Sequence, residues 1–148
     1  MEVQPDFREL LALLNKQAVE YLIVGDYALA FHGAPRFTGD IDILVRPEPQ
    51  NAARILDALH EFGFGSLGLT EEDFSTPHNV AQLGTPPVRV DLVTSLTGVS
   101  WDDAAAAKSP GSYGDVSVFF IGQKEFIANK RAMGRKKDLA DIEALGEE

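Results

Sequence analysis

The hydrophobic positions of the chain follow two spacings, one typical of helices and one typical of strands. Apolar residues three or four positions apart predict helices over residues 5–18 and 50–62. Short runs of branched apolar residues, of which 21–24 is the first, predict buried strands. The further expected strands are 39–45, 78–83, 87–94 and 115–121, and the further expected helices are 27–32, 101–108, 122–132 and 136–146. Helices and strands are mixed along the 148 residues, which predicts one α/β (α+β) domain over residues 1–148, with a single mixed sheet flanked by helices.

The expected strand 39–45 carries two carboxylates, although aspartate is among the poorest strand formers. Successive side chains of a strand point to opposite faces, so Asp40 and Asp42 share one face while Ile41 and Ile43 share the other. Two carboxylates this close repel each other, and one pKa rises unless a cation lies between them. The pattern therefore indicates a divalent-cation site, with Mg²⁺ as the expected ion and Mn²⁺ as its substitute.

A third carboxylate, Asp91, fits the same plan. In the expected strand 87–94, Arg89 and Asp91 face one way and the apolar residues face the other. If this strand lies beside 39–45, its carboxylate joins the other two. Three carboxylates can hold two metal ions about 3.5–4 Å apart, and one of them can also accept a proton. The alternative, that these side chains line the solvated face of a half-exposed sheet, stays open at this point.

A candidate phosphate site lies just upstream. Residues 22–25 form a strand that ends in Gly25, and a helix begins near Asp26. A helix N-terminus presents unpaired N–H groups and a partial positive charge to an anion. The chain therefore brings a candidate phosphate cradle close to the candidate metal site.

Charge and composition narrow the classes of function. The formal net charge of −10 argues against broad non-specific binding to nucleic acid. Six basic residues against one acidic residue gather between positions 124 and 137, within a helical C-terminal segment of about 122–146. This basic patch suits one polyanionic ligand such as a triphosphate, and the alternative is a solvated helix face. Cysteine is absent, which excludes thiol nucleophiles. A cytoplasmic protein without membrane spans is expected, because no apolar run is long enough and the N-terminus lacks a signal-peptide pattern.

One motif is misleading. The stretch 63–68, GFGSLG, matches the dinucleotide fingerprint G-x-G-x-x-G. That motif requires a strand before it and a helix N-terminus after it, whereas here a helix precedes it and an acidic triplet soon follows. We interpret it as a helix terminus that runs into a glycine-rich loop.

Together the remaining motifs resemble the nucleotidyltransferase superfamily typified by DNA polymerase beta. The residues that carry the resemblance are VGDYALAFHGAPRFTGDIDILV (24–45), VDLVTSLTGV (90–99) and NKRAMGRKKDLADIEAL (129–145). They are most similar to a small bacterial and archaeal group that includes abortive-infection-type toxins. The resemblance covers nearly the whole chain.

The resemblance implies a Mg²⁺-dependent transfer of a nucleotidyl group from a nucleoside triphosphate (NTP) to a hydroxyl or phosphate acceptor, which is an RNA, a protein or a small molecule. It also implies a toxin–antitoxin or defence setting with an antitoxin-like partner protein. Asp40, Asp42 and Asp91 would be the catalytic metal ligands, with Asp91 also a candidate base. The implied nucleotide-binding residues are Gly25, Asp26, Arg36, Thr38, Lys130, Arg135 and Lys137. For Lys137, Asp138 and Asp141 the alternative is pairing on a helix surface.

The chain departs from the family pattern at Asp26, where the family has Gly or Ser. Aspartate is a good N-cap, and its carboxylate would accept the N–H groups that otherwise bind phosphate. One outcome is that Asp26 turns outward or joins the metal shell. The other is a blocked site, in which case the chain is a catalytically degenerate relative that acts as a binding or partner module.

Overall fold

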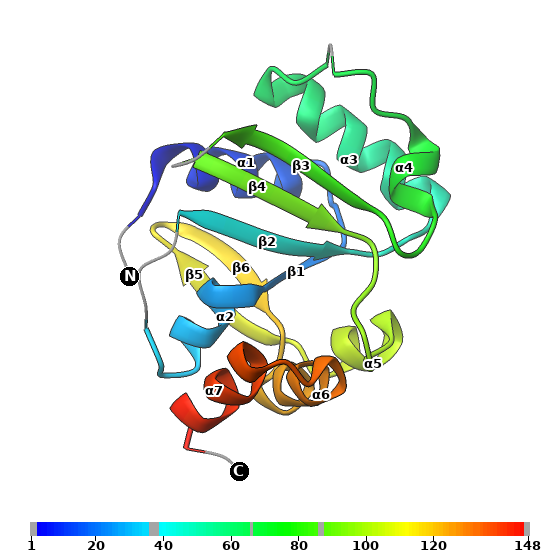
Figure 1. The fold of residues 1–148 in the computed structure, drawn as a ribbon. Coiled ribbons are helices and arrows are strands. Elements are labelled where there is room, and N and C mark those ends of the chain that lie inside the picture. The colour runs from blue at the N-terminus through cyan, green and yellow to red at the C-terminus, as the bar shows by residue number, and fades with distance from the viewer. Residues whose placement is uncertain (1–2, 36–38, 66, 86–87, 147–148) are drawn as a thin grey trace.

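The computed structural model describes residues 3–35, 39–65, 67–85 and 88–146, which form one six-stranded sheet and its covering helices (Figure 1). The strands are β1 (Tyr21–Val24), β2 (Asp40–Val45), β3 (Val80–Thr85), β4 (Val88–Val93), β5 (Ser109–Tyr113) and β6 (Val116–Phe120). The helices are α1 (Pro5–Lys16), α2 (Gly25–Phe31), α3 (Pro49–Phe62), α4 (Glu71–Ser75), α5 (Trp101–Ala106), α6 (Gln123–Met133) and α7 (Lys136–Ala144). None of the helices in the described ranges is both long and apolar enough to cross a membrane.

The sheet is mixed, and its strand order is β3-β4-β2-β1-β6-β5. β2 pairs with β4 in parallel and β1 meets β6 in parallel, whereas the other neighbours are antiparallel. The predicted fold class, a single mixed sheet flanked by helices, is confirmed. The central strands β1 and β2 are the most deeply buried, and their apolar side chains form the middle of the core.

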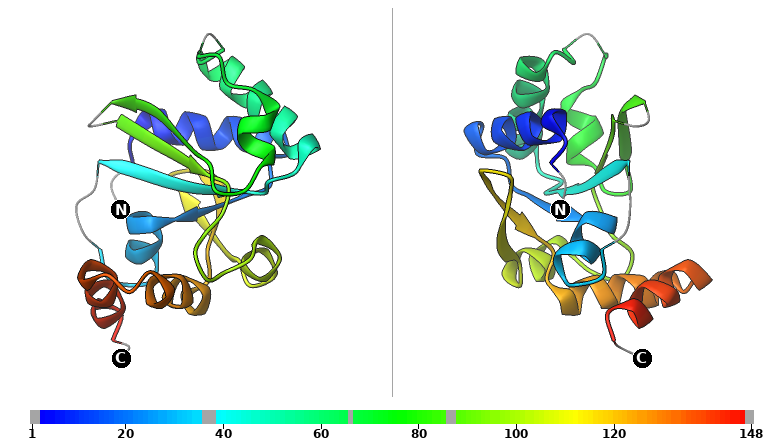
Figure 2. Two further views of the ribbon diagram at one scale, coloured as in Figure 1. Left: turned by 45° about the vertical axis from the view of Figure 1, so that its right-hand side comes forward. Right: turned by 90° about the vertical axis from the view of Figure 1, so that its left-hand side faces the viewer.

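Helices cover the sheet unequally. α1 and α3 pack on one face, and each buries an apolar stripe that includes Phe7 and Leu14 of α1 and Ile55 and Leu59 of α3. Figure 2 shows α2, α6 and α7 on the opposite side of the sheet from α1 and α3. The helices on this second face cover it only in part, and the face stays open beside β2 and β4.

Two elements have no counterpart in the sequence analysis, α4 and β5. β5 reads SPGSY and lacks alternating apolar residues, so its strand state comes from antiparallel pairing with β6. Gly111 is required there, because a Cβ atom at that position would lie 2.8 Å from the Phe31 ring and 2.9 Å from the Phe120 ring. Those two rings stack with centroids 4.1 Å apart. Tertiary packing overrides local propensity at this strand.

The glycine-rich stretch after α3 is the helix terminus that we expected. Gly63 adopts a left-handed conformation (φ 100°) and its N–H donates to the His60 carbonyl, which ends α3. α4 then begins with three acidic residues in its first turn. The dinucleotide-binding interpretation is accordingly rejected.

Asn51 joins the start of α3 to the sheet. Its side chain is 1% exposed, accepts from the Glu20 N–H at 2.8 Å, and donates to the carbonyl oxygens of Glu20 at 3.1 Å and Arg46 at 3.0 Å. These contacts fix the beginning of β1 to the end of β2. Because the other end of β2 carries the aspartates, Asn51 helps to set the position of the candidate site.

Replacement of Asn51 by leucine should lower the free energy of unfolding by about 2–3 kcal/mol. The change fills a similar volume but removes the partner of the Glu20 N–H and of the Arg46 carbonyl, while the Glu20 carbonyl keeps the Arg46 N–H. Urea denaturation followed by circular dichroism measures the loss, with the exposed neighbour Gln50→Leu as control. Equal stability of the two variants would contradict this account.

Candidate active site

The parallel register of β2 and β4 sets the aspartates side by side. Asp42 lies opposite Asp91, and Asp40 lies opposite Arg89. Residues opposite each other on adjacent strands project to the same face. The geometric expectation from the sequence, that the strand of Asp91 lies beside the strand of Asp40 and Asp42, is therefore confirmed.

Gly25 allows the first turn of α2 to approach the Asp42 carboxylate closely. Its φ is +66°, and a Cβ atom there would lie only 2.3 Å from Asp42 Oδ2. Any other residue would be strained in backbone conformation and would collide with the carboxylate. The glycine that the sequence analysis chose as a phosphate cradle thus touches the candidate metal ligand directly.

Asp26 lies within the first turn of α2 and is not its N-cap, which is Val24. The expectation that Asp26 would cap this helix is corrected by that placement. Its charge reaches Asp42, as the charge of Asp40 also does. We refer to Asp26, Asp40, Asp42 and Asp91 as the carboxylate cluster.

Asp42 is the electrostatically strained member of the carboxylate cluster. Burial raises the pKa of Asp42 to about 6, with further increases from the negative charges of Asp91, Asp26 and Asp40. This is the behaviour expected of two close carboxylates without a metal ion between them. The cluster therefore has excess negative charge that a bound cation would stabilise.

Arg89 places one positive charge beside the carboxylate cluster. Its Nη2 atom lies 3.2 Å from Asp40 Oδ2 and 3.0 Å from Asp91 Oδ2. The sequence placed Arg89 on the same face as Asp91 but gave it no role. A role for Arg89 could have been predicted from its position two residues before Asp91, because residues two apart on a strand lie side by side on one face.

Whether a metal ion fits the cluster can be judged from the oxygen atoms that would coordinate it. As placed, the described residues contain no ready-made group of three metal-ligating side chains. Two carboxylates are instead held by Arg89, while the buried Asp91 Oδ1 accepts from no N–H donor among the described residues. Carboxylate oxygens are the ligands that Mg²⁺ prefers. The donor chemistry fits this ion, provided that Arg89 gives way to it.

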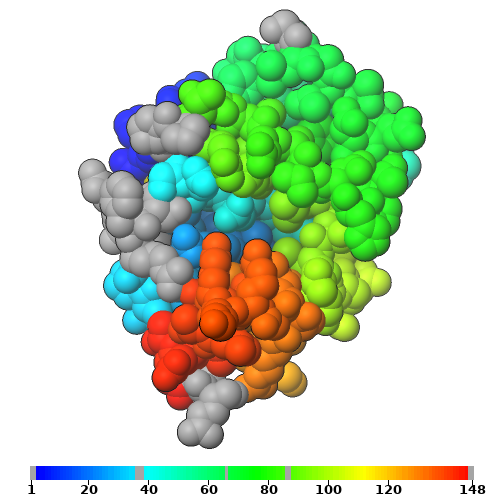
Figure 3. Space-filling model, viewed as in Figure 1, coloured from blue at the N-terminus to red at the C-terminus, as the bar shows by residue number. Residues whose placement is uncertain are grey.

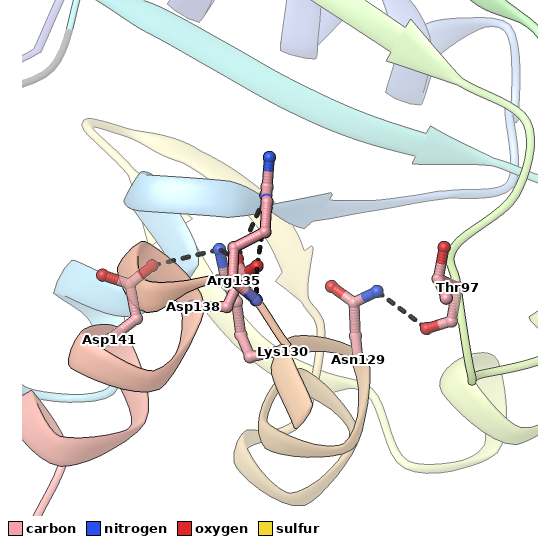
Figure 4. Close-up of polar contacts among 6 residues, drawn as sticks. All are labelled: Thr97, Asn129, Lys130, Arg135, Asp138 and Asp141. Atoms are coloured by element: carbon pink, nitrogen blue, oxygen red, sulfur yellow. Dashed lines mark hydrogen bonds and ion pairs between the residues drawn. The ribbon is translucent and has the colours of Figure 1, made fainter. Parts of the chain in front are cut away.

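The basic C-terminal segment has a different arrangement from the one that the sequence suggested (Figure 4). Lys130 of α6 is 7% exposed and its Nζ lies 3.1 Å from Asp141 and 3.5 Å from Asp138, both on α7 and both fully buried. Its charge is thus matched inside the protein. The alternative that we kept for Lys137, Asp138 and Asp141 was pairing on a helix surface. The structure corrects it, because Asp138 and Asp141 are buried and pair with Lys130 of the neighbouring helix.

Arg135 and Lys137 remain at the surface. Arg135 donates from its backbone N (3.1 Å), from Nε (2.6 Å) and from Nη2 (3.1 Å) to the Asp138 carboxylate. Nη1 has no hydrogen bond within the described part of the chain, and Figure 4 shows the guanidinium directed from α7 toward the sheet. Arg135 is therefore held in one orientation with one nitrogen available to an anion.

A hollow in the surface separates this C-terminal part from the rest of the molecule. Figure 3 shows α6 and α7 on one side of the hollow and the green segment of β3 and β4 on the other, with blue-to-cyan atoms as its floor. The two walls are joined by Asn129, whose Nδ2 donates to the Thr97 carbonyl at 2.8 Å. Thr97 and Gly98 belong to the loop between β4 and α5. Gly98 allows this loop to approach α6, since a Cβ atom there would lie 2.5 Å from the Cβ atom of Ala132.

Not every predicted residue can be placed. Arg36 and Thr38 lie outside the described residues, so their predicted roles stay predictions. Among the histidines, His32 contacts the Ile121 carbonyl through Nε2 at 2.7 Å.

Comparison with known families decides the relationship. Residues 4–148 match the family model described as "Nucleotidyl transferase of unknown function (DUF2204)". The chain belongs to this family. Nearly the whole nucleotidyl transferase chain takes part in the match, so the superfamily resemblance seen in the sequence is confirmed. A search of curated proteins gives no match.

Solved structures share the fold of this nucleotidyl transferase family member. A "putative nucleotidyltransferase" from Thermotoga maritima superposes with a TM-score of 0.64 at 15% identity, over 96% of this chain and 93% of that one. The lincosamide antibiotic adenylyltransferase LnuA, crystallised with lincomycin, gives a TM-score of 0.58 at 12% identity, over 97% and 96% of the two chains. At these identities the likeness concerns the fold.

Replacement of Asp42 by asparagine should stabilise the metal-free protein at pH 7.5 by about 1–2 kcal/mol. The raised pKa of Asp42 means that the folded state holds its proton up to about pH 6, whereas the unfolded chain loses it near pH 4. The stability contributed by this carboxyl is full below pH 4 and is lost as the pH rises through 6. Chemical denaturation in EDTA at pH 4 and 7.5 measures the effect, and exposed Asp57→Asn is the control. A variant that is less stable than wild type at pH 7.5 would contradict the assignment.

Replacement of Lys130 by methionine should lower the free energy of unfolding by about 3 kcal/mol. It removes the buried cation that lies 3.1 Å from Asp141, and it leaves Asp138 with Arg135 as its remaining basic partner. The exposed Lys137→Met should change stability by less than about 0.5 kcal/mol. Thermal and urea unfolding compare the two. If both variants were equally stable, Lys130 would not be the structural cation that these distances indicate.

Proposed function

We propose that this protein transfers a nucleoside monophosphate group from an NTP to an acceptor hydroxyl or phosphate in a Mg²⁺-dependent reaction. The observation that carries the proposal is the juxtaposition of Asp42 and Asp91 on adjacent parallel strands, directly against the first turn of α2 at Gly25. Membership of the nucleotidyl transferase family supports the reaction class.

The proposed metal ligands are Asp40, Asp42 and Asp91. When bound, Mg²⁺ would neutralise charge on the phosphates and orient the attacking oxygen. Asp91, the most buried of the three carboxylates, would accept the proton of the acceptor. The acceptor oxygen forms a bond to the α-phosphorus, the bond from that phosphorus to the bridging oxygen breaks, and pyrophosphate leaves.

The phosphates of the NTP need positive charge opposite the carboxylate cluster. Arg135 is the best-placed described residue, because Asp138 fixes its guanidinium and leaves Nη1 available. The exposed Lys137 can add to it. We no longer assign Lys130 to the phosphates, because its ion pairs lie inside the protein. Gly25 and the first turn of α2 complete the proposed phosphate contacts.

A second candidate function is favoured by one observation, the negative charge of Asp26 near Asp42. Asp26 stands in the first turn of α2, where the phosphates would come. Repulsion there costs about 1 kcal/mol in water and several times that where water is excluded. On this alternative, the protein is a degenerate family member that binds a ligand or partner without turnover.

Calorimetry with ATP, CTP, GTP and UTP, with and without Mg²⁺, tests the proposal. We expect one or more NTPs to bind only with Mg²⁺, and Asp42→Asn to weaken binding by about 100-fold, or about 3 kcal/mol. Asp57→Asn should bind like wild type. Binding that appears only in Asp26→Gly would favour the degenerate alternative, and its absence from both proteins would contradict nucleotide transfer.

The acceptor is identified by incubation with α-³²P-labelled NTPs. RNA, protein and small-molecule fractions are offered in parallel, and pyrophosphate release is followed. The resemblance to abortive-infection-type toxins leads us to include cellular RNA, and the name of LnuA, an antibiotic adenylyltransferase, leads us to include small hydroxylated compounds. Growth arrest on expression, relieved by Asp42→Asn, would support a toxin with an antitoxin-like partner.

A further inference from the structure

Arg89 lies where a cation is needed to hold the carboxylate cluster together. A single nitrogen, Nη2, contacts both Asp40 on β2 and Asp91 on its own strand, β4. The register explains this position, because Arg89 is opposite Asp40 and shares a face with Asp91. Arg89 is therefore a built-in counter-cation that bridges the two strands.

The bridge formed by Arg89 is incomplete. Its Nε atom and Asp91 Oδ1 are both buried, and neither has a hydrogen-bond partner among the described residues. Buried polar atoms are almost always satisfied. The Asp91 oxygen can coordinate a cation, whereas the Nε–H group needs an acceptor that the present position of the guanidinium does not give it. The Lys130 ion pairs show the contrast, since there one buried cation lies within 3.5 Å of both acids.

The charge of Arg89 is also insufficient for the whole cluster. It is paired with Asp40 and Asp91, while Asp42, which lies opposite Asp91, feels the negative charges of all three other aspartates. A divalent ion between Asp42 and Asp91 would bring two positive charges to that position. Such an ion would repel the guanidinium that stands beside it.

We propose that Arg89 is a positioning residue that gathers Asp40 and Asp91 in the metal-free protein and leaves them when Mg²⁺ binds. The inference rests on the proposed function, because it assumes a metal at the carboxylate cluster. Arg89 then competes with the metal for the same oxygens, so the apparent metal affinity is the intrinsic affinity multiplied by the fraction of molecules in which the bridge is open. In return it keeps the carboxylates at the correct spacing before the metal arrives.

Arg89→Met tests the competition through metal binding and needs no activity assay. Mn²⁺ affinity is measured by calorimetry and by electron paramagnetic resonance on the full-length chain. We expect the variant to bind Mn²⁺ about tenfold more tightly than wild type. In EDTA it should melt at a lower temperature, and saturating Mg²⁺ should raise its melting temperature by more than it raises that of wild type.

Arg46→Met is the matched control for the loss of one positive charge. Arg46 follows β2 at its opposite end and pairs with Glu20 at 3.0 Å on the surface. Its replacement should change Mn²⁺ affinity less than about twofold. Equal gains in Arg46→Met and Arg89→Met would show a general charge effect and would overturn the proposal, as would unchanged or weaker Mn²⁺ binding in Arg89→Met.

Two further measurements separate this inference from the proposed function. If neither wild type nor Arg89→Met binds Mn²⁺ in a way that Asp42→Asn abolishes, the proposed metal site fails. If both bind and Arg89→Met binds more weakly, only the role of Arg89 fails.

Should Arg89→Met not fold, ¹⁵N NMR of wild type follows the Arg89 Nε–Hε signal, assigned with Arg89→Lys. A Mg²⁺-dependent shift of that signal to solvent-like exchange supports displacement, and an unchanged signal at metal saturation overturns it.

Discussion

The parallel pairing of β2 with β4 is the contact on which the candidate site depends. It places Asp42 opposite Asp91 and Asp40 opposite Arg89 on one face, and it buries the intervening apolar residues on the other. Because side chains alternate along a strand, a slip of one residue would turn the apolar residues of that strand to the solvent and its aspartates to the core. The hydrophobic core and the carboxylate cluster therefore enforce the same register.

Two groups of partly or fully buried charges stand out in the described part of the chain, and their charges are balanced in different ways. Lys130, Asp138 and Asp141 form a closed set in which the cation and acids come from adjacent helices. The carboxylate cluster is left with excess negative charge and with unsatisfied buried atoms at Arg89 and Asp91. A satisfied buried network supports the fold, whereas an unsatisfied one costs free energy and calls for a functional explanation. This difference locates the candidate chemistry at the sheet and assigns the helical network to structure.

The helical network also serves the site indirectly. Asp138 belongs to the buried set and at the same time holds the guanidinium of Arg135, which is directed toward the sheet. Asn129 and Gly98 join α6 to the loop that leaves β4. Arg135, the residue proposed to bind the phosphates, lies on one wall of the hollow and is thereby connected to the strand that carries Asp91 on the other. The site is a product of packing between the sheet and the C-terminal helices.

The sequence by itself predicted the main helices and strands, a single mixed sheet, and the shared face of Asp40 and Asp42, because alternation and helical spacing are local properties. It left open whether the strand of Asp91 lies beside theirs, which the parallel pairing of β2 with β4 decides. It did not predict β5, whose strand state depends on β6 and on ring packing over Gly111. It also grouped Lys130 with Arg135 as one basic patch. Only the tertiary structure showed that Lys130 faces buried acids, that Asp26 lies inside the first turn of α2, and that Arg89 bridges two strands. Partners of a charge are set by contacts between distant segments, and spacing along the chain carries no record of them.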